Sequence, residues 1–165
     1  VMLKAAQSFP NYQILIAGAP NMDDQVYLDI AKKTPVKIVR NETYELLNIA
    51  HMAAVTSGTA TLETALFKVP QVVCYKGNPI SVGIARKLIK VKYISLVNLI
   101  MDKELVKELI QKDLTKTSLA NELEKFDDAK SSDRLALVKA YTELETILGG
   151  GGASEKVADL IIAEN

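Results

Sequence analysis

A nine-residue stretch at positions 55–63, VTSGTATLE, combines hydroxyl groups, a glycine and an acid in an order that suits anion binding. It has the pattern of a strand end, a glycine turn and the start of an amphipathic helix. N–H groups at a helix start have no intrahelical acceptor, and the helix dipole places partial positive charge beside them. The stretch therefore predicts that Ser57, Gly58, Thr59 and Thr61 bind a phosphate group.

Glu63 falls in the first turn of this predicted helix. A reciprocal capping box would need Ser or Thr at position 60, where the sequence has Ala. We therefore expect the Glu63 carboxylate to be free to accept hydrogen bonds from a ligand, such as sugar hydroxyls beside the phosphate. The alternative is that Ser57 or Thr59 simply caps a helix, and the stretch by itself leaves both interpretations open.

Composition excludes several other kinds of chemistry. Lysine plus arginine and aspartate plus glutamate number 20 each, so no overall field favours nucleic acid. The single cysteine, Cys74, excludes an intramolecular disulfide and a cysteine-based metal cluster, and its apolar neighbours predict a buried residue. His51 is the only histidine, so a multi-histidine metal site is excluded as well. We expect no metal or other cofactor.

The 165 residues suit one domain, and the apolar pattern alternates between short β-rich runs and helical stretches. That alternation predicts a parallel, doubly wound sheet with helices on both faces. Extended segments are predicted at residues 12–19, 36–40, 53–56, 71–75 and 93–100. Helices are predicted from residue 2 and at 22–33, 43–51, 59–68, 79–89, 103–111, 118–126, 131–148 and 154–164.

Three predicted strands end in residues that suit ligand contacts. They are followed by Gly18 with Ala19, by residues 57–61, and by residues 76–79. Ligands of doubly wound sheets bind outside the carboxyl ends of the strands, so these segments should converge on one edge. The sequence has no P-loop, and no Gly-x-Gly-x-x-Gly follows a strand, which excludes the usual triphosphate and dinucleotide sites.

The two ends of the chain carry their own predictions. Val1 begins inside a helical pattern without a cap or a preceding strand, as expected of a fragment of a longer protein. We predict a main domain over residues 1–148, with a glycine hinge and a last helix over residues 149–165. The alternative for the glycines is an extended helix cap. No signal peptide or apolar run of transmembrane length is evident.

A cluster of basic residues lies in and after the predicted helix that Pro79 opens: Arg86, Lys87, Lys90 and Lys92. Apolar residues alternate with them, which would suit a surface that meets anionic lipid or a phosphorylated substrate. The alternative is an ordinary surface helix with a solvated charged face. Both interpretations remain open.

Several motifs, in order, resemble the C-terminal half of the lipid-A-disaccharide synthases: SGTATLE, VP, VVCYK, ARKLIKV, YISLVNL, ELVKEL and a late GASE. The resemblance covers essentially the whole chain. It implies a Rossmann-like, three-layer domain of the GT-B type with a helical C-terminal extension, and a first strand with a phosphate-contacting loop before Val1.

The resemblance also implies an activity. The family transfers 2,3-diacylglucosamine from its UDP donor to 2,3-diacylglucosamine 1-phosphate, with inversion, in lipid A biosynthesis. Its general base is expected in the N-terminal domain, so the catalytic residues stay unassigned here and we expect this chain to be inactive alone. Expected partners are both acylated substrates, that N-terminal domain and an anionic membrane surface, at the cytoplasmic face of a bacterial inner membrane.

Donor-site positions follow from the resemblance. Ser57, Gly58, Thr59, Thr61 and Lys76 would contact the diphosphate, Glu63 the ribose, and Asn98 the donor phosphates or sugar. Gly18 is assigned to the donor site without a specified contact. Lys76 stands where many members have arginine, so a bidentate contact is replaced by a point charge. Val97 stands where the family usually has proline, which leaves the loop geometry before Asn98 less defined. An Asp-x-Asp metal motif is not present.

Two other function classes are alternatives for this sequence. One is another GT-B enzyme that uses UDP-N-acetylglucosamine, such as a 2-epimerase or the lipid-linked peptidoglycan transferase. The other is a signalling module of the response-regulator type, for which Asp23 and Asp24 would be the acidic pair. Acids are favoured at a helix start in any case, so this pair does not argue for signalling.

Overall fold

The computed structural model describes residues 1–56, 58–77, 92–149, 152, 157–159 and 161–162. Ser57 lies outside the described residues, and so do the predicted helix at 79–89 with Arg86, Lys87 and Lys90, and most of the predicted last helix.

Short parallel strands form two sheets in the described part of the chain. In the first, β1 (Ile14–Ala17) pairs with β2 (Val36–Val39). In the second, β4 (Gln71–Tyr75) lies between β3 (Ala53–Thr56) and β5 (Lys107–Ile110). The predicted α/β fold with parallel strands is confirmed, but the strands divide into two sheets where the sequence predicted one.

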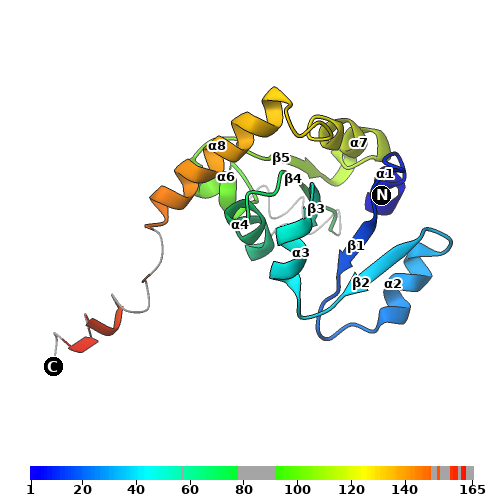
Figure 1. Cartoon of the computed structure of the whole chain (residues 1–165), viewed down its shortest axis with the longest axis horizontal. Helices are drawn as coiled ribbons and strands as arrows, with labels where there is room; N and C mark the ends of the chain where they lie inside the picture. The colour runs from blue at the N-terminus through cyan, green and yellow to red at the C-terminus, as the bar shows by residue number, and fades with distance from the viewer. Residues whose placement is uncertain (57, 78–91, 150–151, 153–156, 160, 163–165) are drawn as a thin grey trace.

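Helices cover both sides of the strands. Figure 1 shows α3, α4, α6 and α8 on one side and α1, α2 and α7 on the other, which gives three layers. The helices are α1 (Met2–Ala6), α2 (Asp24–Ala31), α3 (Thr43–Ile49), α4 (Thr59–Leu66), α6 (Leu96–Met101), α7 (Lys116–Glu124) and α8 (Ser132–Ile147), with a 3₁₀ turn η1 (Gln111–Asp113) after β5.

Side-chain caps explain where several helices start. The carboxylate of Asp23 accepts a hydrogen bond from the N–H of Gln25 at 2.8 Å and caps α2. Helix capping therefore explains the acidic residue at this position. Thr115 forms a capping box with Ser118 at the start of α7, and Ser131 caps α8. Each such cap contributes about 1 kcal/mol.

Two predicted elements after residue 92 are wrong. The run 93–100, predicted as extended, turns into α6 because the Ser95 side chain accepts from the N–H of Asn98 and starts a helix. Residues 103–111, predicted as a helix, contain β5 instead. Val106 and Leu109 fit a helical period, but pairing with the edge of β4 supplies ladder bonds and burial that override that local preference.

The hydrophobic core is centred on β4. Val72 and Val73 are fully buried and Cys74 nearly so, as expected for a strand covered on both faces. Burial raises the pKa of the Cys74 thiol to about 11, which agrees with its prediction as a buried residue. Leu119 of α7 and Tyr141 of α8 close the core from opposite sides.

Gly149 ends α8. It adopts φ +81° and donates its N–H to the carbonyl of Thr146, which is the usual role of a helix-terminating glycine. This supports the cap interpretation at that one glycine, while the hinge stays a prediction. Among the described residues, no helix combines the length and apolarity needed to cross a bilayer.

Candidate functional site

The turn between β3 and α4 has an unusual backbone at Gly58. This residue adopts φ +143° and ψ −162° at the N-cap of α4 and makes no side-chain cap bond. A Cβ added there would have no atom within 4 Å. Glycine is therefore required by the backbone conformation, because residues with side chains rarely adopt that region, and the space in front of the turn is open.

The first N–H groups of α4 have no acceptor among the residues that the structure describes. Thr59 is the first helical residue and is exposed together with Ala60. Neither N–H donates to any described residue, whereas the N–H of Thr61 bonds to the carbonyl of Gly58 at 3.2 Å. The predicted strand–turn–helix junction is confirmed, and Thr59 does not cap the helix. The available N–H groups make this a candidate anion site.

Thr61 stabilises the turn from its buried side. Its side chain is 0% exposed, and its hydroxyl donates to the carbonyl of Gly58 at 2.7 Å. Its own carbonyl accepts from the side chain of Gln71 at 2.9 Å, and Gln71 also bonds the hydroxyl of Tyr141. A buried chain of hydrogen bonds thus links the turn to α8. Thr61 holds the turn in shape and does not present its hydroxyl to the surface.

Glu63 is the fifth residue of α4 and lies in its second turn, one turn later than predicted. The helix begins at Thr59 because the extended Gly58 separates it from β3. The carboxylate is half-buried and makes no hydrogen bond or ion pair within the described part of the chain. The carboxylate can therefore accept hydrogen bonds from a ligand, as the sequence predicted. Its place in the helix differs from the predicted first turn.

Lys76 follows the carboxyl end of β4 and is exposed. Because β3 and β4 are parallel and paired from Ala53 to Thr56, Lys76 and Gly58 lie at the ends of neighbouring strands. The following residue, Gly77, is held by Gln111, whose side chain donates to its carbonyl at 3.1 Å. Sequence reasoning missed Gln111; its left-handed φ of +53° directly after β5 is visible only in the structure.

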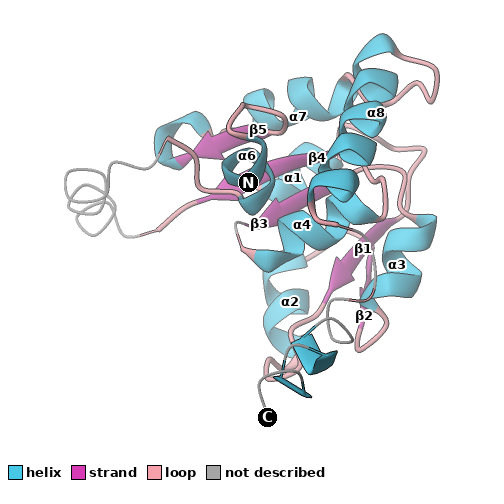
Figure 2. Ribbon diagram, turned by 90° about the vertical axis from the view of Figure 1, so that its left-hand side faces the viewer, coloured by secondary structure: helices cyan, strands magenta, loops and turns pink. Residues whose placement is uncertain are grey.

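Gly18 follows β1, in the other sheet. A Cβ at Gly18 would lie 3.0 Å from Ile38 of β2, so glycine is favoured by this close packing. Figure 2 shows the arrowhead of β1 on the same side as those of β3 and β4, so Gly18 and Gly58 share one edge of the molecule.

Arg40, at the end of β2, fixes the loop after Gly18. Its guanidinium donates to the carbonyls of Ala19, at 2.8 Å, and Met22, and it pairs with Asp24 at 2.6 Å. The sequence predicts Arg40 only as the last residue of a strand. An arginine at the carboxyl end of a strand was the signal that could have pointed to this role.

Asn98 is fully buried, and its amide is saturated. It donates to the carbonyl of Val106 and to Glu108, and it accepts from the N–H groups of Leu105 and Val106, all within 2.8–2.9 Å. Glu108 also accepts from the N–H and hydroxyl of Ser95. The predicted contact between Asn98 and the donor substrate does not fit this geometry, because both polar atoms of the amide are already bonded within the protein. The Asn98 side chain instead holds the start of α6 against β5.

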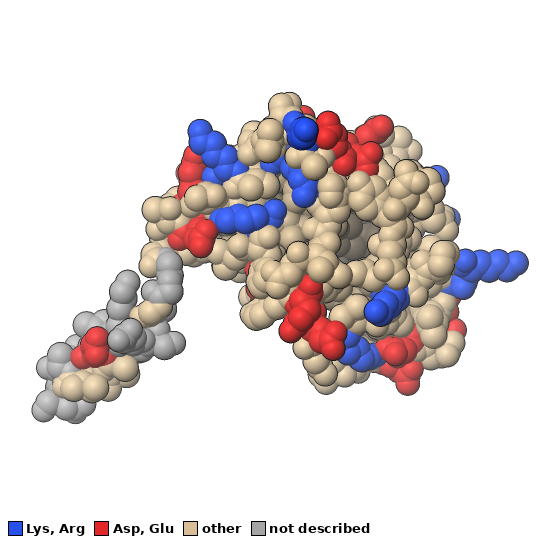
Figure 3. Space-filling view, viewed as in Figure 1, with Lys and Arg blue, Asp and Glu red and all other residues tan. Residues whose placement is uncertain are grey.

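Charge on the surface is mixed. Figure 3 shows lysine and arginine interspersed with acids on the face in view, as the balanced composition predicted. Lys92, the one described member of the predicted basic cluster, is exposed and lies 4.9 Å from the centre of the Tyr93 ring. The membrane interpretation of that cluster stays a prediction.

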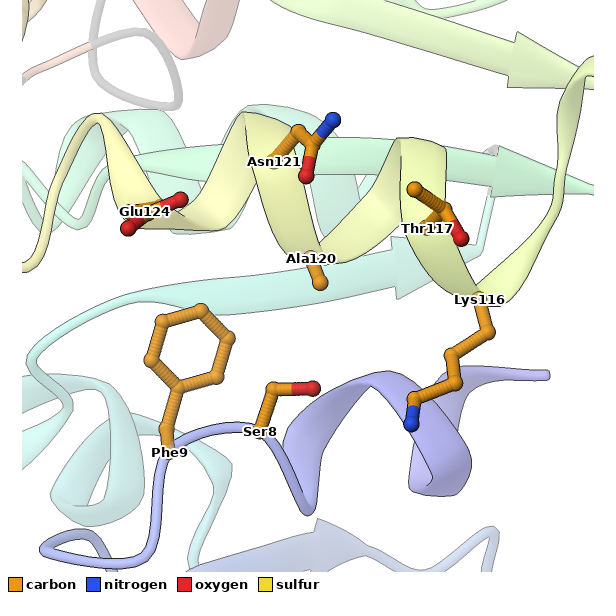
Figure 4. Close-up of a pocket in the computed structure, with 7 residues that line it drawn as sticks. All are labelled: Ser8, Phe9, Lys116, Thr117, Ala120, Asn121 and Glu124. Carbon is orange, nitrogen blue, oxygen red and sulfur yellow. The ribbon is translucent and has the colours of Figure 1, made fainter.

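A separate pocket of about 290 Å³ lies in the helical layer, between the turn after α1 and helix α7 (Figure 4). Ser8 and Phe9 face Ala120 and Glu124 across it, with Lys116 at its far end. None of the predicted site residues lines this pocket. It is distinct from the candidate site at the strand ends.

Comparison with known proteins gives matches over almost the whole chain. The family model described as lipid-A-disaccharide synthetase matches residues 2–148. Lipid-A-disaccharide synthase of Anaeromyxobacter dehalogenans (strain 2CP-C) is 33% identical over 168 residues, which is 98% of this chain and 44% of that protein. The enzyme of Syntrophus aciditrophicus is 38% identical over 165 residues, 96% of this chain and 43% of its own. The chain thus spans less than half the length of these relatives.

Proposed function

Because the chain belongs to the lipid-A-disaccharide synthetase family, we propose that it forms the donor-binding part of a glycosyltransferase. The whole protein would transfer 2,3-diacylglucosamine from UDP to 2,3-diacylglucosamine 1-phosphate, with inversion, to make the disaccharide precursor of lipid A. Membership of this family favours the present proposal over the two alternatives, a different UDP-sugar enzyme and a signalling module.

The observation that carries the donor site is the start of α4. Within residues 58–63 lie an open glycine turn, two N–H groups and a half-buried carboxylate, and none of these three polar groups has a partner among the described residues. In the proposal, the diphosphate lies against Ser57, Gly58 and Thr59. Thr61 serves by holding the turn, and Glu63 accepts from the ribose hydroxyls.

Charge stabilisation is the chemistry that these residues offer. As the glycosidic bond to UDP breaks, negative charge develops on the leaving diphosphate. Preorganised N–H dipoles at the helix start stabilise such charge without further reorganisation, and the Lys76 ammonium at the neighbouring strand end adds a full positive charge. Gly18 and the loop fixed by Arg40 would bound the site on its other side.

The remaining parts of the reaction belong to the rest of the protein. The general base and the acceptor site are proposed to lie in an N-terminal domain, with Asn98 contributing only by positioning α6. Both substrates carry acyl chains, so we propose action at the cytoplasmic face of the bacterial inner membrane. Purified alone, the 165-residue chain should not turn over the two acylated substrates.

Titration with UDP and with UMP, followed by amide chemical shifts, tests the donor site. Shifts should centre on Gly58 to Glu63, and UDP should bind more tightly than UMP because it adds a phosphate at the helix start. Glu63→Gln should weaken the binding of both nucleotides about tenfold without lowering the free energy of unfolding, since the carboxylate has no partner among the described residues.

Glu104→Gln is the matched control for that titration. Glu104 is exposed and precedes β5, at the amino ends of the strands, where it pairs with Lys107. This variant should bind UDP like the unchanged chain. Shifts centred away from residues 58–63, or equal UDP affinity in both variants and the unchanged chain, would contradict the proposed site.

A further inference from the structure

Gln71, the first residue of β4, is a buried polar residue whose amide is only half used. Its side chain is fully buried, and its Nε2 donates to the carbonyl of Thr61 at 2.9 Å and to the hydroxyl of Tyr141 at 3.3 Å. Its Oε1 has no hydrogen-bond partner among the described residues. A buried acceptor in that state costs free energy, so packing alone does not explain a glutamine at this position.

The Gln71 amide reaches the turn before α4 through Thr61. The N–H and the hydroxyl of Thr61 both donate to the carbonyl of Gly58, at 3.2 and 2.7 Å. The carbonyl of Thr61 accepts from Gln71 on the other side. Thr61 is thus held from two directions, and the N–H groups of Thr59 and Ala60, which directly precede it, take their direction from the same turn.

Tyr141 joins this amide to α8. The Tyr141 side chain is fully buried, and its hydroxyl accepts from Gln71, which restricts the rotation of the amide. Burial raises the pKa of this hydroxyl above its usual value, so it stays neutral and keeps the contact at physiological pH. Helix α4 lies beside α8 (Figure 1) and has a second link to it at its other end. There Lys68 donates to the backbone carbonyl of Tyr141 at 3.1 Å and pairs with Glu145 at 2.6 Å.

We propose that Gln71 and Tyr141 are positioning residues for the donor site. Tyr141 orients the Gln71 amide, and Gln71 holds the first turn of α4 so that its N–H groups point at the diphosphate. This role rests on the proposed function of the turn and extends it to two residues that do not touch the ligand. It also accounts for the unpartnered Oε1, because the glutamine is kept for the donor side of its amide.

Replacing the pair by apolar residues of similar shape should separate nucleotide binding from stability. In the double variant Gln71→Met with Tyr141→Phe, neither side chain buries a polar group. The Thr61 carbonyl keeps the N–H four residues later as its ordinary helical partner. The midpoint of urea unfolding should therefore be unchanged or higher. UDP should nevertheless bind about fivefold more weakly, because the first turn of α4 is no longer held in one orientation.

UDP titration and ligand-free amide spectra of the unchanged chain, both single variants and the double variant test the proposal. Tyr141→Phe alone should weaken UDP binding about twofold, and it should add nothing once Gln71 is replaced, because the hydroxyl acts only through the amide. Without ligand, the amides of Thr59 and Ala60 should shift in every variant that lacks Gln71. Lys68→Met is the matched control, since it removes the link at the far end of α4 and should bind UDP like the unchanged chain.

Four results would overturn the proposal: unchanged UDP affinity in the double variant, additive effects of the two substitutions, an equal loss in Lys68→Met, or a double variant that loses stability together with affinity. The last would assign the pair an ordinary structural role. If Gln71→Met alone does not fold, the double variant and Tyr141→Phe decide. The ligand-free spectra use no nucleotide. A chain that binds no UDP, while its Thr59 and Ala60 amides move as expected, would therefore refute the donor site and keep the positioning of the turn.

Discussion

Replacing Gly58 by alanine should weaken both the fold and nucleotide binding, through the backbone alone. At φ +143° and ψ −162°, a residue with a side chain is strained by about 1–3 kcal/mol. No neighbouring atom lies within 4 Å of the added Cβ, so crowding adds nothing. If the turn relaxes instead, the two bonds from Thr61 to the Gly58 carbonyl weaken, at about 1 kcal/mol each.

Both routes give a similar loss of stability. Urea unfolding of Gly58→Ala should show a free energy of unfolding lower by about 1–3 kcal/mol, or about 2–4 °C in Tm for each kcal/mol. Because the relaxed turn moves the N–H groups of Thr59 and Ala60, UDP affinity should fall about tenfold or more in the same titration.

Gly149→Ala is a matched control, since Gly149 also has a positive φ, +81°, and open space around its Cβ position. It lies at the end of α8, so it should lose about 1 kcal/mol of stability and bind UDP normally. The reasoning is refuted if Gly58→Ala unfolds and binds UDP like the unchanged chain, or if Gly149→Ala impairs binding equally.

Two further predictions concern groups away from the turn. Glu108→Gln should lower the free energy of unfolding by about 2 kcal/mol in urea, because the new amide would face the donors of Ser95 and Asn98; a loss no larger than that of the exposed Glu104→Gln would contradict this. Cys74, whose pKa is raised from 9.0 to about 11, should alkylate at pH 8 about 100-fold more slowly in the native protein than in urea. Its neutral thiol contributes stability below pH 9 that is lost as the pH rises toward 11, and equal alkylation rates would show that the site opens.

Much of the first half of the chain was predictable, because local signals and tertiary structure agree there. The bounds of β3 and β4 matched the structure. For β4 the reason is local, because a short run with two valines between Pro70 and Gly77 has few alternatives. The predictions for the segments around α6 and β5 were wrong because the apolar pattern there fits both a helix and a strand. Which of the two forms depends on pairing with the edge of β4. The division into two sheets is a property of strand pairing, which no single segment encodes.

For the candidate site, residue types were more predictable than geometry. The glycine turn and the free carboxylate of Glu63 follow from the order of residues along one stretch. The burial of Thr61 and Asn98 does not, because each points into a network assembled from distant segments. Arg40 and Gln111 were missed for the same reason: their partners, Ala19 and Gly77, are fixed only when separate loops meet.

The packing of α1 on α7 has a consequence for synthesis on the ribosome. The hydroxyl of Tyr12, just after α1, donates to the carbonyl of Asp127, a residue 115 positions later. At about 5–20 residues per second, roughly 6–23 s pass between the synthesis of these partners. During that interval the side of α1 that packs on α7 lacks this partner. Chaperone binding to nascent chains should therefore be strongest in this window and fall once α7 has emerged.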